Sequence, residues 1–348
     1  MNARPRRSPL QSMSKLALCI LFLAACAHGP STASSYFDNT GRDDVLAGGV
    51  KVISISTPKG RFNVWTKRVG NNPRIKVLLL SGGPGVAHDF WAALDSYFPA
   101  AGIEYYYYDQ LGTGLSDRPD DTDLWDLSRS VEEVEQVRVA LKLDRDDFYL
   151  YGISWGGLLA TEYALKYQQH LKGVIISDMM ASVPAYNEYA RRVLEPAMDP
   201  RNLAEILAME AAKKYDDPHY EELLLPFYTQ HLLRMPPDQW PEPVVRSFNT
   251  INKKMYVLMQ GPSEMGASGR LENWDRFAQL KTITVPTLVI GGKYDTMDPD
   301  YLEKMTRELP RGRHVTCPNG SHLSLYDDQK IYMDALIQFV NDVDQGRM

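Results

Sequence analysis

The chain alternates short apolar runs with segments in which apolar residues recur at every third or fourth position. The first two runs, 50–57 and 61–69, alternate apolar and polar residues and are joined by Pro-Lys-Gly, which predicts a β-hairpin. The next runs are almost continuously aliphatic or aromatic, as strands buried on both faces of a sheet are. They begin at Ile75, Ile103, Asp147, Lys172 and Pro286, and a further strand is expected from Gly312.

Helical patterns lie between these runs. Val131, Val134, Val137 and Leu141 share one helical face, and further helices are predicted over 158–168, from Asp298 and over 328–343. Buried strands that alternate with helices indicate an α/β fold, with a mostly parallel sheet flanked by helices.

The pattern changes between Ser182 and Leu280. This stretch is helical, is interrupted by prolines and holds no strand-like aliphatic run. We therefore predict an inserted helical cap at 182–280, carried by a sheet domain formed from 43–181 and 281–348.

The first 25 residues have the pattern of an export signal. Four basic residues and no acid precede an apolar core at 16–25, and this core is too short to span a bilayer as a helix. The last four residues, Leu23-Ala24-Ala25-Cys26, resemble the lipobox of bacterial lipoproteins. The resemblance implies removal of 1–25, lipid on Cys26 and a tether over 26–42. An ordinary signal with an incidental cysteine is the alternative.

Charge and cysteine content narrow the choice of function. The whole chain carries a net charge of −6, and loss of the four basic residues of the signal would leave about −10, which argues against nucleic-acid binding. The chain has Cys19, Cys26 and Cys317. After cleavage and lipidation one thiol remains, so neither an internal disulfide nor a cysteine metal site is expected.

The chemistry is predicted at strand ends. Gly152-Ile153-Ser154-Trp155-Gly156 matches G-x-S-x-G between a predicted strand and a predicted helix, a context that lifts a serine hydroxyl above the sheet. A serine nucleophile needs a base and an orienting acid, and in this arrangement they follow in the order serine, acid, histidine. Asp295 and His322 lie at further strand ends in that order, so the three are expected at three successive strand ends.

The competing histidines are weaker candidates. His314 lies inside a predicted strand, and His219 and His231 fall in the cap. Acyl transfer also needs donors for an oxyanion. The loop Ser-Gly-Gly-Pro-Gly at 81–85 follows the third strand, where such a donor is expected, and the N–H of Trp155 would supply the other.

These motifs resemble the proline iminopeptidases and the related tricorn-interacting aminopeptidases, which are serine peptidases of the α/β-hydrolase fold. The resemblance runs from about 50 to 343. It covers the 81–85 loop, "YYDQLGTGLSD" at 107–117 and "GISWGG" at 152–157, together with "FYTQHLLR" and "MQGPSEM" in the cap and "WDRFAQLKTITVPTLVIGGKYD" at 274–295.

The resemblance implies hydrolysis of the N-terminal residue of a peptide, often proline, with Ser154, Asp295 and His322 as the triad. It also implies an oxyanion hole formed by Gly83 and Trp155, and a substrate amine bound by acids near the cap, of which Glu264 is one. No metal or organic cofactor is implied.

Three positions depart from the family pattern. The 81–85 loop begins with Ser81 where the family has histidine, and Leu111 replaces an arginine. Thr296 stands where the tricorn-interacting enzymes have a second amine-binding glutamate, so the amine is expected to meet Glu264 and the neutral Thr296.

The sequence as a whole predicts a lipid-anchored serine aminopeptidase that acts on short peptides. It would be exported to a bacterial cell envelope and face the periplasm, and Ala27 after the cysteine favours the outer membrane. Two alternatives stay open. One is an esterase or amidase of the same fold, and the other is a binding lipoprotein built on an inactive hydrolase. The oligomeric state is not predicted.

Overall fold

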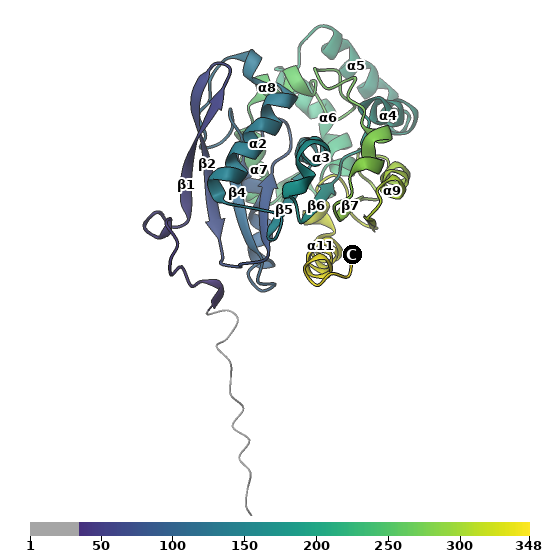
Figure 1. Cartoon of the computed structure of the whole chain (residues 1–348). Coiled ribbons are helices and arrows are strands. Elements are labelled where there is room, and N and C mark those ends of the chain that lie inside the picture. Colours follow the sequence, from purple (N-terminus) through teal and green to yellow (C-terminus); the bar gives the residue numbers. More distant parts are fainter. Residues whose placement is uncertain (1–34) are drawn as a thin grey trace, which may run out of the picture. The chain divides into compact units, whose positions relative to one another are not determined.

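The computed structural model describes residues 35–348, and Cys26 with its predicted signal lies outside them. Among the described residues, eight strands form one sheet in the order β1-β2-β4-β3-β5-β6-β7-β8 (Figure 1). The strands are β1 (Val50–Thr57), β2 (Gly60–Val69), β3 (Lys76–Leu80), β4 (Glu104–Asp109), β5 (Phe148–Ile153), β6 (Gly173–Ser177), β7 (Thr287–Gly292) and β8 (Gly312–Cys317).

The predicted hairpin and the predicted parallel sheet are both confirmed. β1 pairs antiparallel with β2, with Val50 opposite Lys67, and β2 pairs antiparallel with β4. All later pairs are parallel. Because β3 to β7 run parallel, their carboxyl ends lie at the same edge of the sheet, where loops can place side chains close together.

Helices cover both faces of the sheet. Alternate residues of β3 show the two layers: Leu78 and Leu80 pack under α2, α3 and α9, whereas Val77 and Leu79 pack under α11 and the short helix at His88–Ser96. The helices of this part are α2 (Leu127–Leu141), α3 (Trp155–Tyr167), α9 (Pro299–Glu308), α10 (Ser324–Asp327) and α11 (Gln329–Asp344).

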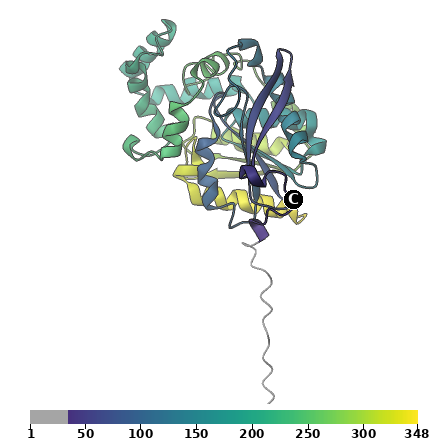
Figure 2. The ribbon, with the colours of Figure 1, turned by 90° about the vertical axis from the view of Figure 1, so that its left-hand side faces the viewer.

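The stretch predicted as a cap is helical. It contains α4 (Val183–Tyr189), α5 (Pro200–Ala211), α6 (Pro218–His231), α7 (Glu242–Asn249) and α8 (Lys253–Met259). In Figure 2 its teal and green helices extend to one side of the sheet. Ile206 of α5 and Leu224 of α6 belong to a small separate core, while Val244 of α7 and Met255 of α8 join the two cores of the sheet.

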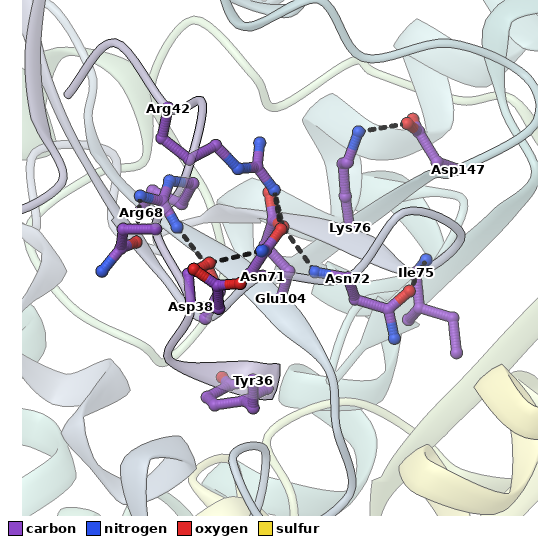
Figure 3. Close-up of polar contacts among 12 residues, drawn as sticks. Tyr36, Asp38, Arg42, Arg68, Asn71, Asn72, Ile75, Lys76, Glu104 and Asp147 are labelled. Carbon is purple, nitrogen blue, oxygen red and sulfur yellow. Dashed lines mark hydrogen bonds and ion pairs between the residues drawn. The ribbon is translucent and has the colours of Figure 1, made fainter. Parts of the chain in front are cut away.

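The prediction of a tether over 26–42 is wrong for residues 35–42, the part that the structure describes. Tyr36 is 3% exposed, and its hydroxyl donates to the carbonyl oxygen of Ile103 at 2.8 Å. Arg42 donates to Oε2 of the fully buried Glu104 at 2.6 Å and to Asn71 (Figure 3). Residues 35–42 thus fold onto the domain, because Tyr36 and Arg42 have buried partners.

Candidate active site

Ser154 lies on a sharp turn between β5 and α3. Its backbone has φ 54° and ψ −124°, outside the regions that side chains favour, and its N–H donates to the carbonyl oxygen of Ser177 at 2.9 Å. Both glycines of the motif are required. A Cβ on Gly152 would lie 1.9 Å from the carbonyl oxygen of Gly156, and one on Gly156 would lie 2.0 Å from that of Leu80. The turn therefore exists only because these two positions lack side chains.

His322 and Asp295 form a buried pair. Nδ1 of His322 lies 2.7 Å from Oδ1 of Asp295, and the side chains are 4% and 0% exposed. Burial lowers the pKa of His322, but the charge and hydrogen bond of Asp295 outweigh it and raise the pKa above its ordinary value. The N–H of His322 donates to the carbonyl oxygen of His231, so the end of α6 helps to fix the histidine loop.

Ser154 and His322 line one cavity of about 600 Å³. Gly82 and Gly83 of the 81–85 loop line the same cavity, and so does Glu264 from the cap. Much of the remaining wall is aromatic, formed by Phe90, Tyr220, Tyr228, Trp240, Phe248 and Tyr256. The cavity thus combines the candidate nucleophile and the candidate base with the carboxylates of Glu221 and Glu264 in a mainly apolar enclosure.

Of the two predicted oxyanion donors, Gly83 lies in the cavity lining, and Trp155 directly follows Ser154, which is also in the lining. Trp155 is the first residue of α3, where backbone N–H groups have no partner within the helix. Gln110, from the "YYDQ" segment, connects Trp155 with the 81–85 loop. Its side chain accepts from Nε1 of Trp155 at 3.0 Å and donates to the carbonyl oxygen of Ser81 at 3.2 Å. The sequence motif contains this glutamine but does not reveal its role.

Glu264 is held by tyrosines. Oε1 accepts from the hydroxyl of Tyr256 at 2.6 Å, and the backbone oxygen accepts from the hydroxyl of Tyr186 at 2.7 Å. Burial, followed by the charge of Glu264, raises the pKa of both tyrosines well above the ordinary value, so both are neutral donors. A carboxylate fixed in this way can face a cationic group in the cavity.

Thr296 does not lie where an amine-binding residue must. Its side chain is fully buried, is not part of the cavity wall, and donates to Oδ1 of Asp295 at 3.2 Å. Its hydroxyl also lies 3.3 Å from Nδ1 of His322. The prediction that Thr296 binds the substrate amine is therefore wrong, since the hydroxyl supports the acid and the base from behind.

The three triad candidates are not at successive strand ends. Ser154 follows β5, Asp295 follows β7 and His322 follows β8, so β6 lies between the serine and the acid. The residue directly after β6 is Asp178, which is fully buried and has φ 49°. An acid after a predicted strand on the same sheet edge was the available signal for this residue, which the motif search missed.

In residues 35–348, no group of three or more His, Cys, Asp or Glu side chains is arranged to hold a metal ion. The described part of the chain contains one free cysteine, the buried Cys317. None of the described helices is long and apolar enough to cross a membrane.

The fold and this site define a serine hydrolase of the α/β-hydrolase class, and residues 76–329 match the family model described as alpha/beta hydrolase fold. The chain is 52% identical over 298 residues to the proline iminopeptidase of Flavobacterium johnsoniae, covering 85% of this chain and 100% of that protein. The chain belongs to the proline iminopeptidase family.

Two solved structures resemble the fold closely. The proline iminopeptidase of Mycobacterium smegmatis has a TM-score of 0.74 at 27% identity, over 85% of this chain and 100% of that one. VinJ has a TM-score of 0.78 at 27% identity, over 84% and 99%.

Proposed function

We propose that the protein is a serine aminopeptidase that releases the N-terminal residue, with a preference for proline, from short peptides. One observation carries the proposal: the cavity of Ser154 and His322 also contains the carboxylate of Glu264, in a wall of aromatic and aliphatic side chains. A substrate ammonium loses its water on entering such a cavity, and a carboxylate offsets that cost. The ring of proline fits an aromatic wall, and the proline iminopeptidase family supports the same preference.

The reaction follows from the positions of the side chains. Ser154 Oγ attacks the carbonyl carbon of the first residue while His322 takes its proton, and Asp295 stabilises the imidazolium. The N–H groups of Gly83 and Trp155 stabilise the oxyanion. His322 then protonates the departing amine, and a water molecule activated by the same histidine hydrolyses the acyl-enzyme.

A free amine is the feature that separates this function from an esterase. We expect the protein to cleave proline p-nitroanilide and to cleave N-acetylproline p-nitroanilide at least about 100-fold more slowly, because acetylation removes the charge that Glu264 binds. p-Nitrophenyl acetate measures the ester activity of the same serine. Equal rates on the free and the acetylated anilide would overturn the aminopeptidase proposal and leave a general hydrolase.

We further propose that the protein is exported and anchored by lipid on Cys26, facing the periplasm and favouring the outer membrane. Support comes from the basic start, the short apolar core and Leu23-Ala24-Ala25-Cys26. Cys26→Ser should abolish incorporation of labelled palmitate, whereas Cys19→Ala, which changes a cysteine inside the signal, should not. Labelling that survives Cys26→Ser would refute the anchor.

A further inference from the structure

Asp178 lies behind the catalytic acid, in a place the reaction as described does not use. It follows β6 directly and is fully buried, as is Asp295. The two carboxyls approach the same point of the backbone. A Cβ on Gly291 would lie 3.4 Å from Oδ1 of Asp178 and 3.6 Å from Oδ2 of Asp295, which places these two oxygens in one neighbourhood. The charge of Asp295 and a side-chain hydrogen bond to it both contribute to the raised pKa of Asp178.

Oδ2 of Asp295 needs a donor. Oδ1 of this carboxylate accepts from His322, Thr296 and the N–H of Met297, but Oδ2 is buried and no N–H or hydroxyl among the described residues donates to it. A buried carboxylate oxygen without a donor is costly. The remaining group in contact with Asp295 is the carboxyl of Asp178, which can donate only in its protonated form.

The surroundings of Asp178 fix where its proton lies. Oδ2 of Asp178 accepts from the hydroxyl of Ser177. The oxygen of that hydroxyl lies 2.6 Å from the hydroxyl of Tyr332, which in turn contacts the hydroxyl of Tyr151. Since the Ser177 proton is used on Asp178, Tyr332 must donate to Ser177 and Tyr151 to Tyr332. Ser177 donates to Oδ2, and the N–H of Gly292 donates to Oδ1 at 3.2 Å. A hydroxyl oxygen can accept one hydrogen bond and still donate its proton, so a neutral Asp178 can carry its proton on Oδ1 and donate it toward Asp295.

We propose that Asp178 is a positioning residue of the reaction: its neutral carboxylic acid donates a hydrogen bond from Oδ1 to Oδ2 of Asp295. This hydrogen bond orients the carboxylate of Asp295, which holds His322. It also reduces the effective negative charge of that carboxylate. The inference rests on the proposed roles of Asp295 and His322. Two ionised carboxylates in contact in a buried site would repel each other, and one shared proton removes that repulsion.

The electrostatic surroundings agree with one negative charge on the pair. Burial, followed by the charge of Asp295, raises the pKa of Asp178 well above its ordinary value. The other titratable groups facing Asp178 are Tyr151, Tyr332 and Cys317, each with a pKa raised chiefly by burial and so neutral near pH 7. The charges of Glu264 and Asp327 act on His322, and the charge of Asp295 acts on Tyr186, Tyr189 and His231. The variants described below leave these five residues unchanged.

Two substitutions suit the left-handed backbone of Asp178 and differ in the hydrogen bond. Asparagine tolerates φ 49° and its amide can donate to Asp295, whereas glycine adopts the conformation freely and leaves Oδ2 without a donor. The readout is the rate at which a fluorophosphonate labels Ser154 as a function of pH, which follows the ionisation of His322 without needing any peptide substrate.

We expect Asp178→Asn to keep the labelling rate within about threefold and the acid midpoint within about 0.3 pH units. Asp178→Gly should lower the rate at least about tenfold and move the midpoint to higher pH, because an untempered Asp295 holds the imidazolium more strongly. Thermal unfolding of both variants checks that the fold is intact. If the glycine variant does not fold, the asparagine variant decides alone.

A fall of the midpoint by more than about one unit in Asp178→Asn would show that Asp178 is ionised in the native protein, and would overturn the inference. A glycine variant with native rate and midpoint would do the same. Absence of labelling in the unmodified protein is a different result, since it contradicts the assignment of Ser154 as nucleophile.

Discussion

Glu264→Gln isolates the charge that makes this cavity suited to a peptide N-terminus. The substitution keeps the shape of the side chain, and the amide oxygen can still accept from the hydroxyl of Tyr256. What is lost is the negative charge facing the substrate. The chemistry at Ser154 and His322 is left in place, so the variant tests binding of the amine separately from acyl transfer.

The size of the effect follows from the change in bond type. Hydrogen bonds to charged groups contribute about 1.5–3 kcal/mol, whereas those between neutral groups contribute about 0.5–1.5 kcal/mol. The centres of these ranges differ by about 1.3 kcal/mol, which is close to tenfold in binding. Because Thr296 lies behind the triad, it cannot take over the missing contact. We therefore expect KM for proline p-nitroanilide to rise at least about tenfold.

The assay compares two substrates and two variants. Steady-state kinetics with proline p-nitroanilide should show the rise in KM, while p-nitrophenyl acetate, which has no ammonium, should react within about twofold of the native rate. Glu221→Gln is the matched control. Glu221 also lines the cavity, but its side chain is 73% exposed and lies 3.5 Å from Lys253. Its removal should change KM by less than about twofold, since exposed ion pairs contribute little.

Equal slowing of the ester and the anilide by Glu264→Gln would refute this reasoning. It would mean that Glu264 supports the fold of the cap through Tyr256 and Tyr186 and does not bind the amine. A rise in KM of the same size in Glu221→Gln would also count against it, because the effect would then belong to the total charge of the cavity.

Three further outcomes are expected. Ser154→Ala and His322→Ala should each lower kcat for proline p-nitroanilide at least about 1,000-fold, because triad members act as a unit; retention of most activity in either would contradict the triad. The kcat/KM of the native protein should fall on the acid side with an apparent pKa above the ordinary 6.5 or so of histidine, because the charge of Asp295 raises the pKa of His322 against the effect of burial; an acid limb below that value would contradict the pairing. Tyr36→Ala should lower the free energy of unfolding by about 3 kcal/mol, as measured by urea denaturation, because a buried ring and its bond to Ile103 are lost; an unchanged midpoint would show that residues 35–42 do not stabilise the domain.

Much of the fold could be predicted because its signals are local. The hairpin, the buried parallel strands and the helix at Leu127–Leu141 each follow from an apolar pattern within about fifteen residues. The serine turn is also local, since Gly152 and Gly156 are needed by contacts that the G-x-S-x-G spacing encodes. The packing of residues 35–42 on the domain cannot be predicted from a local pattern, because Tyr36 bonds to Ile103, 67 residues away.

The site is harder to predict because side-chain direction is not visible in a motif. The position after the catalytic acid suggested an amine ligand, but Thr296 turns toward Asp295 and His322, where a short hydroxyl can reach them. Glu264 and Tyr256 are eight residues apart in the cap, and the sequence does not tell that their side chains meet at 2.6 Å. Residue identity predicted which chemistry is present, whereas the direction of each side chain decides which group it acts on.

Asp178 illustrates a kind of residue that neither motifs nor local patterns predict. None of the motifs quoted above includes it, and its meaning depends on β6 lying beside β7 in the sheet, so that its carboxyl approaches that of Asp295. Once the sheet order is known, the donors can be counted. Oδ2 of Asp295 lacks a donor, whereas Asp178 accepts from the hydroxyl of Ser177 and the N–H of Gly292, and the hydroxyls of Tyr332 and Tyr151 can donate in series toward Ser177. A buried polar chain of this kind orients the catalytic acid only if its last member is protonated. Supporting residues of this type are therefore found by counting donors and acceptors around the catalytic groups, because they have no motif of their own.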